Sequence, residues 1–212
     1  MWYFMKRIFL FLSLLASSSI AFANNGIERY KALSDGGDPE SAYKLGMVYY
    51  FGVDGEVNVN VGDAVKYLTL AEERGVARAS TILGKHYFDN NNYKEATKHF
   101  KLASVKGERL ALSYLGKIME DNDKDGAERL YRASVRGGSA SPLSYLMFGQ
   151  FLINKYERGS TKSLEGYAIL INLKLSGKDT KMEVDRFLRI NDYKFNERDR
   201  EVLNQLRERY KI

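Results

Sequence analysis

The stretch that decides the fold reads GDPESAYKLGMVYYFG and covers residues 37–52. Gly46 lies inside it, with Ser41 five residues earlier, Leu45 directly before it and Tyr49 three residues later. Offsets of −5, −1, 0 and +3 fall on one side of an α-helix. The stretch therefore predicts a helix whose small residues let a second helix approach closely. That close packing offsets the roughly 1 kcal/mol that a glycine inside a helix costs.

The same arrangement recurs at intervals of about 35 residues, which is the range of helical repeats. The central glycines of the four copies are Gly46, Gly84, Gly116 and Gly149. A second helical pattern follows each of them and ends at a glycine suited to the left-handed position after a helix; these are Gly75, Gly107, Gly137 and Gly177. Asn60 and Asn92 are good N-caps for two of these second helices, with Asp63 and Glu95 placed to answer at the third helical position. Each unit is thus predicted to be a helix, a loop, a second helix and a glycine stop.

Incomplete elements flank the four copies. Residues 27–32 read as a lone second helix, and the pattern lapses after Gly177. Val184 and its neighbours predict one further helix, and Asn196 as an N-cap predicts another. Terminal elements that depart from a repeat usually cover its exposed apolar end. We therefore expect repeats over residues 24–177 and C-terminal capping helices over residues 178–212.

Residues 37–52 resemble the opening of a Sel-one-like repeat, a short, glycine-marked relative of the tetratricopeptide repeat. Residues 64–75 and 96–107 resemble its second helix, and the likeness covers roughly residues 37–177. The fourth copy departs from the pattern: Phe148 stands where leucine is usual, and Leu173 stands where alanine is usual. The resemblance implies an all-α fold, an α-solenoid of stacked antiparallel helix pairs (a tetratricopeptide-like superhelix). It also implies a concave surface that binds a protein, without naming that protein.

The N-terminus has the features of a secretory signal. Lys6 and Arg7 precede an apolar run over residues 8–15, and small residues lead to Ala21-Phe22-Ala23. A positive segment, a short apolar core and an A-x-A site predict cleavage after Ala23. The alternative is an uncleaved membrane anchor, but the apolar core is short for a bilayer span. We expect residues 1–23 to be a signal peptide, the mature protein to be periplasmic or secreted, and no stable membrane insertion after cleavage.

Charge and composition limit the classes of partner and of chemical site that the chain can have. The formal net charge is +6, or +4 once Lys6 and Arg7 leave with the signal, and acidic residues are interleaved with the basic ones. This pattern argues against a nucleic-acid partner and leaves open a mildly acidic protein or an anionic membrane surface. The chain has no cysteine, which excludes disulfides, thiol catalysis and thiolate metal sites. We expect no cofactor.

The two histidines, His86 and His99, raise the question of a base or a metal pair. His99 occupies the place that Tyr67 holds in the first copy, which is a packing position. No nucleophile motif or third ligand accompanies the two, so we expect structural or surface roles.

The sequence DNDKDG over residues 121–126 looks like the start of a calcium loop. The twelfth position of such a loop should be a glutamate that binds through both oxygens, but here it is Arg132. We therefore interpret the run as an acidic turn in which Asn122 or Asp123 caps the next helix, and expect no bound metal.

A candidate binding surface lies at offsets −2, +1 and +4 from the repeat glycines, which point away from the side where each pair packs. Aromatic, methionine and lysine side chains there are typical of interface centres that are mildly basic. The alternative is a partly exposed helix face on which lysine stems cover their neighbours. The predicted partner-binding residues are Lys44, Met47, Tyr50, Lys85, Phe88, Tyr114 and Lys117.

Four functions remain at this point. The leading one is an exported protein–protein interaction module or scaffold that binds a protein partner through the concave face of the solenoid. The alternative is an immunity protein that neutralises a lipase-like effector of a type VI secretion system in the periplasm. A third is an assembly factor for envelope structures. An enzyme is disfavoured, because no catalytic set is visible in the sequence.

Overall fold

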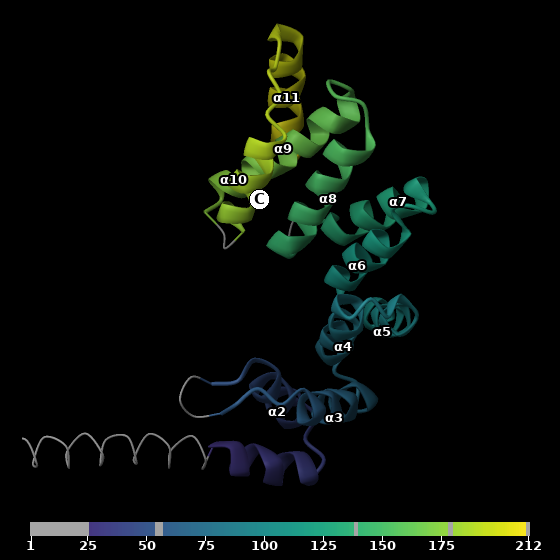
Figure 1. The fold of residues 1–212 in the computed structure, drawn as a ribbon, viewed down its shortest axis with the longest axis vertical. Coiled ribbons are helices and arrows are strands. Elements are labelled where there is room, and N and C mark those ends of the chain that lie inside the picture. The colour runs from purple at the N-terminus through teal and green to yellow at the C-terminus, as the bar shows by residue number, and fades with distance from the viewer. Residues whose placement is uncertain (1–25, 54–56, 138–139, 178–179, 211–212) are drawn as a thin grey trace, which may run out of the picture. The chain divides into compact units, whose positions relative to one another are not determined.

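The structure is a computed structural model, and it describes residues 26–53, 57–137, 140–177 and 180–210 (Figure 1). The predicted signal peptide, residues 1–23, lies outside the described residues. The chain divides into two compact units, residues 1–83 and 84–212. The boundary between the units falls inside helix α4 (Ala77–Asp89).

The described part of the first unit contains a helix over residues 26–35, then α2 (Pro39–Phe51), α3 (Val61–Glu73) and the first half of α4. The carboxylate of Asp38 starts α2 by accepting a hydrogen bond of 2.7 Å from the backbone N–H of Ser41. Pro39 follows at the first helical position, where its missing N–H costs nothing. Buried alanines and leucines of α2, α3 and α4 form the core of this unit.

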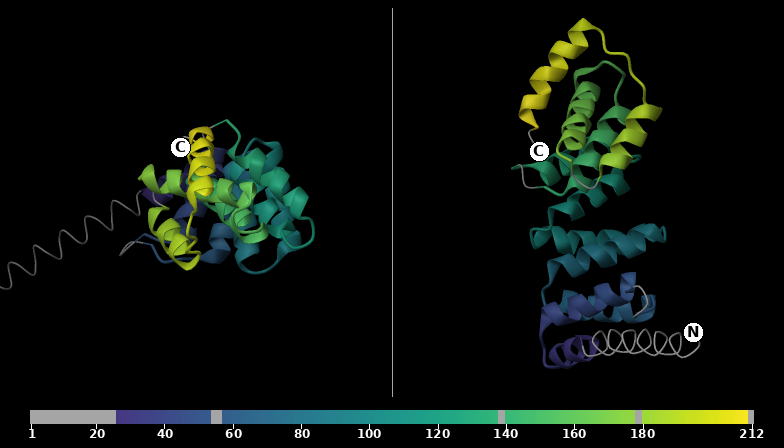
Figure 2. Two further views of the ribbon diagram at one scale, coloured as in Figure 1. Left: turned by 90° about the horizontal axis from the view of Figure 1, so that it is seen from above. Right: turned by 90° about the vertical axis from the view of Figure 1, so that its left-hand side faces the viewer.

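The second unit begins with the rest of α4 and continues through seven further helices over its described residues. They are α5 (Tyr93–Val105), α6 (Arg109–Met119), α7 (Lys124–Val135), α8 (Pro142–Lys155), α9 (Thr161–Leu175), α10 (Lys181–Ile190) and α11 (Glu197–Arg209). α6 packs on α7 and α8 packs on α9, as the repeat predicts. α10 and α11 both pack on α9 (Figure 2). One core cluster joins α5 and α6, and a larger one runs from α7 to α11.

The repeat glycines lie where the two helices of a pair cross, as predicted. A Cβ atom added to Gly84 would lie 2.6 Å from two ring carbons of Phe100, much closer than van der Waals contact allows. Each central glycine faces one large side chain of the second helix in its own pair. Gly46 faces Leu68, Gly84 faces Phe100, Gly116 faces Tyr131 and Gly149 faces Leu170.

The predicted helix ends are also present, but neither Asp63 nor Glu95 completes the capping box expected at its helix. Asn60 and Asn92 cap α3 and α5, and Gly75 follows α3 with a φ of +99°. The acid at the third position of α3 answers differently from the expected capping box. Asp63 accepts from the side-chain amide of Asn60 at 2.6 Å instead of from its backbone N–H. The complete capping box forms instead at Asn196, at the start of α11.

A partly buried polar cluster joins α11 to α7 and α9. The guanidinium of Arg132 on α7 donates to both carboxylate oxygens of Glu165 on α9, at 2.9 and 2.6 Å. The hydroxyl of Tyr210, directly after α11, donates to the same carboxylate at 2.5 Å. Burial acts to raise the pKa of Glu165, but the hydrogen bonds from Arg132 and Tyr210 outweigh it and lower that pKa. We call Arg132, Glu165 and Tyr210 the α11 cluster.

No helix of the described residues has the length and apolar character needed to cross a membrane.

Candidate partner-binding groove

A groove of about 370 Å³ lies on the second unit, across α4, α6 and α8. These are the first helices of the second, third and fourth copies, and they contribute equivalent positions. The residues one after the repeat glycine are Lys85, Lys117 and Gln150, and all three line the groove. The structure therefore brings together four of the seven predicted partner-binding residues, which are Lys85, Phe88, Tyr114 and Lys117.

Tyr114 departs from the expected exposure. Its side chain is buried, and its ring stacks on Phe100 of α5 with centroids 4.7 Å apart. The offset of −2 does point away from the partner helix of the same pair, but it faces the preceding pair instead of solvent. Met147, at the same offset in the fourth copy, also packs against the core cluster of α5 and α6. Residues at offset −2 therefore hold neighbouring pairs together. Tyr114 lines the groove, but its side chain is almost entirely buried.

Phe88 is half-buried and forms the aromatic wall of the groove. Its ring makes edge contacts with Tyr114 and Tyr93, each with centroids 5.5 Å apart. Such arrangements orient an aromatic side chain, so that part of Phe88 stays fixed at the groove surface.

The groove is less basic than predicted, because carboxylates on the same helices pair with its lysines. Lys85 donates to Asp89, and Lys117 donates to Glu120 at 2.9 Å. Glu120 also accepts a hydrogen bond of 2.6 Å from the hydroxyl of Tyr131 on α7. Burial, with this hydrogen bond, raises the pKa of Tyr131, so its hydroxyl stays protonated as a donor. The charged side chains of the groove are thus held in nearly neutral pairs.

The remaining predicted residues, Lys44, Met47 and Tyr50, belong to the first unit, so their alignment with the groove stays a prediction. The ammonium of Lys44 lies over the ring of Tyr30, 5.2 Å from its centroid, in the helix over residues 26–35. Tyr50 is half-buried and packs against the core of the first unit. Lys44 and Tyr50 therefore contribute contacts within the first unit itself.

The sequence reasoning missed the contribution of α8. Leu143, Met147, Gln150 and Asn154 line the groove beside the predicted residues. Met147 and Gln150 stand at offsets −2 and +1 from Gly149, so the same rule finds them when it is extended to the degenerate fourth copy.

Two other sequence candidates, His99 and Asp123, have structural roles. His99 is buried and stacks on Tyr87 at 5.3 Å, just as Tyr67 stacks on Tyr49 at 5.7 Å in the first copy. The packing role predicted for His99 is confirmed. Asp123 caps α7 by accepting from the backbone N–H of Gly126 at 2.7 Å, which confirms the predicted cap.

No protein-family model matches the sequence, and a search of curated proteins gave no match. Solved structures do match. A protective antigen present in uropathogenic Escherichia coli strains, which displays an SLR fold, is similar with a TM-score of 0.72 and 23% identity, over 87% of this chain and 40% of that chain. A Sel1 repeat protein from Oxalobacter formigenes is similar with a TM-score of 0.52 and 21% identity, over 61% of this chain and 55% of that chain.

The chain spans less than two thirds of the length of either structure. At these identities the likeness concerns the fold, and it agrees with the crossing glycines and helix pairs described above. The predicted all-α solenoid is confirmed: the chain has the Sel-one-like repeat (SLR) fold.

Proposed function

We propose that the protein is an interaction module that holds an extended segment of a protein partner in the groove of its second unit. The observation that carries this proposal is the alignment of Lys85, Lys117 and Gln150 from three successive first helices along one groove. A surface that repeats its chemistry at regular steps suits a ligand that also repeats, as an extended polypeptide does.

The spacing supports this match. Packed helices lie about 8–10 Å apart, and an extended chain advances about 3.3 Å per residue. Equivalent positions on neighbouring helices therefore meet about every third residue of an extended segment. Phe88 and Met147 supply apolar contact, and Gln150 and Asn154 supply amide groups that can pair with a peptide backbone.

The test uses a photo-reactive side chain at position 117, with position 101 as the matched control. Lys117 and Lys101 are both exposed, but Lys101 lies on α5 and does not line the groove. Illumination in envelope extracts should cross-link one protein through position 117 and not through position 101. Failure to cross-link any protein selectively through position 117 would refute the groove as the binding site.

Charge reversal gives a second measurement on the captured protein. Lys85→Glu with Lys117→Glu places four carboxylates along the groove and should weaken binding at least tenfold. Lys94→Glu with Lys101→Glu makes the same change of net charge on α5 and should leave affinity unchanged. Equal affinities for both double variants would place the partner elsewhere.

The immunity hypothesis is a narrower form of this proposal, in which the partner is a lipase-like effector. It requires that the purified protein suppress the activity of the cross-linked partner at equal molar ratio. If the cross-linked partner has no enzymatic activity, the immunity hypothesis is wrong and the scaffold hypothesis is retained.

A further inference from the structure

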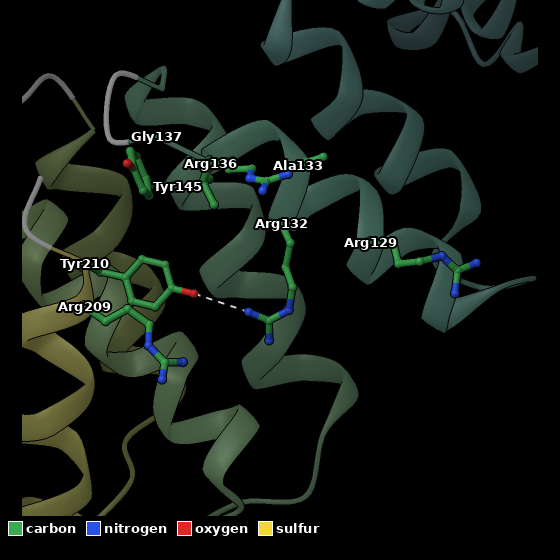
Figure 3. Close-up of a pocket in the computed structure, with 9 residues that line it drawn as sticks. Arg129, Arg132, Ala133, Arg136, Gly137, Tyr145, Arg209 and Tyr210 are labelled. Atoms are coloured by element: carbon green, nitrogen blue, oxygen red, sulfur yellow. Dashed lines mark hydrogen bonds between the residues drawn. The ribbon is translucent and has the colours of Figure 1, made fainter.

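A second recess lies on the second unit, between the C-terminal half of α7 and the end of α11. Its volume is about 530 Å³. Four arginines line it: Arg129, Arg132, Arg136 and Arg209. Figure 3 shows Arg132 and Arg209 on either side of the space beside Tyr210, Arg136 above it and Arg129 at the rim, extending away. We call this recess the arginine pocket.

The arginines of the pocket differ in how closely they pair with carboxylates. Arg132 is already paired with two carboxylates, because it donates to both oxygens of Glu165 and also to Glu128 at 2.9 Å. Arg209 comes no nearer than 3.9 Å to Glu165, whose oxygens already accept from Arg132 and Tyr210. Across the described residues, no carboxylate pairs with the guanidinium of Arg136. The guanidinium of Arg136 therefore borders the pocket without a paired acid, and that of Arg209 makes only a long ion pair with Glu165.

Tyr145 on α8 supplies a further donor. The residue is 2% exposed, it borders the pocket, and its hydroxyl makes no hydrogen bond to any of the described residues. Burial raises the pKa of Tyr145, so the hydroxyl keeps its proton and is able to donate. The hydroxyl itself is not fully enclosed, so water can satisfy it in the free protein, and an acceptor bound in the pocket can replace that water.

We infer that the arginine pocket binds a carboxylate side chain of an acidic protein segment, with Arg136, Arg209 and Tyr145 as donors. This inference rests on the proposed function, because it names a second contact of the same protein partner. Arginine forks match the planar carboxylate in geometry as well as charge. The donors surround a recess with apolar walls of Ala133 and Val135, which suits a protruding side chain better than the flat surface of a membrane.

The experiment measures binding of a fluorescein-labelled hexaglutamate peptide to the whole mature protein, with hexaglutamine as the neutral control. Hexaglutamate should bind in a salt-dependent way and hexaglutamine should not. Arg136→Gln with Arg209→Gln should weaken hexaglutamate binding roughly tenfold or more, since each removes a hydrogen bond to a charged group. Lys94→Gln with Lys101→Gln removes the same charge from α5 and should have little effect.

Tyr145→Phe removes only the hydroxyl and keeps the ring that fills the site. It should weaken hexaglutamate binding several-fold while the melting temperature stays near that of the parent protein. Loss of peptide binding with an unchanged melting temperature identifies the pocket as a binding site. An equal effect of the α5 and pocket double variants on affinity would overturn the inference.

Two further probes separate the sources of the anion. Vesicles containing phosphatidylglycerol and free inorganic phosphate are titrated against the same variants. Binding of vesicles or phosphate that depends on Arg136 and Arg209, without binding of hexaglutamate, would overturn the protein ligand in favour of a phosphate. The proposed function fails separately, through the cross-linking at position 117, so the two proposals can be told apart.

Discussion

At the scale of single residues, Gly84 shows how little space a helix crossing leaves. Replacing it with alanine puts a methyl group 2.6 Å from the ring of Phe100, so either the buried ring or the two helices must shift. We expect Gly84→Ala to lower the free energy of unfolding by about 1–3 kcal/mol, as overpacked cores do. Chemical denaturation followed by circular dichroism measures the change.

Gly62 provides the control for this substitution. It is exposed in the first turn of α3, and a Cβ there would meet nothing closer than 3.5 Å. Gly62→Ala should be neutral or stabilise by up to about 1 kcal/mol, because alanine loses less backbone entropy on folding. Equal losses from both substitutions would contradict the crossing described for Gly84.

Ser144 carries a buried hydroxyl with no hydrogen-bond partner among the described residues. It occupies the position five before Gly149, where Ala79 and Ala111 stand in the second and third copies. Ser144→Ala removes a desolvated hydroxyl and should stabilise the protein by about 1 kcal/mol. In a protein of this size that raises the melting temperature by about 2–4 °C.

Ser41 occupies the same repeat position in the first copy but has a partner, because its hydroxyl hydrogen-bonds to Asp38. Ser41→Ala should therefore give no gain. A lower melting temperature for Ser144→Ala would mean that its hydroxyl is satisfied by something other than the described residues.

Residue offsets within one repeat were enough to predict the glycine crossings and the packing role of His99. They were insufficient for Tyr114, because an offset defines a direction relative to its own helix pair. Whether that direction meets solvent or the preceding pair depends on how the pairs stack. The near-neutral groove was also missed. Asp89 lies one residue beyond the last offset, and Glu120 stands at offset +4 from Gly116, but offsets alone did not predict that it pairs with Lys117.

At the scale of helices, the α11 cluster holds the last helix by charge as well as by apolar packing. The lowered pKa of Glu165 means that the folded protein favours its ionised form. The resulting stabilisation is complete above the ordinary value of 4.5 and is lost as the pH falls through the lowered pKa. We expect Glu165→Gln to cost about 1–3 kcal/mol near neutral pH.

Denaturation of both proteins between pH 7 and pH 3 checks this expectation. The difference between parent and Glu165→Gln should shrink toward zero at the acid end. Glu183→Gln on α10 removes an exposed carboxylate and should change stability by less than about 0.5 kcal/mol throughout. A difference that stays constant with pH would show that the charge of Glu165 contributes nothing.

The sequence indicated that α11 exists but not what holds it. Its N-cap, Asn196, and its apolar positions are local signals. Arg132 and Tyr210, by contrast, are 78 residues apart, and Arg132 and Glu165 are 33 apart. Nothing in a helical period connects such distant charges, and the role of Arg132 emerged only from the folded chain.

At the scale of the whole molecule, the proposed site of action depends on export. We propose that residues 1–23 are removed and that the mature protein starts at Asn24 in the periplasm or outside the cell. N-terminal sequencing of the protein recovered from the periplasmic fraction should begin Asn24-Asn25-Gly26. A product that begins at Met1, or one confined to the cytoplasmic fraction, would contradict export.

The end of α11 belongs to two structures at once. Tyr210 is a member of the α11 cluster, and with its neighbour Arg209 it also forms one wall of the arginine pocket. Occupancy of the pocket and docking of the helix are therefore thermodynamically coupled. A bound carboxylate stabilises the docked position of α11. By reciprocity, a mutation that favours the detached position of α11 lowers the affinity of the pocket for the carboxylate. The protein's hold on its ligand is thus set partly at Glu165, which the ligand never touches.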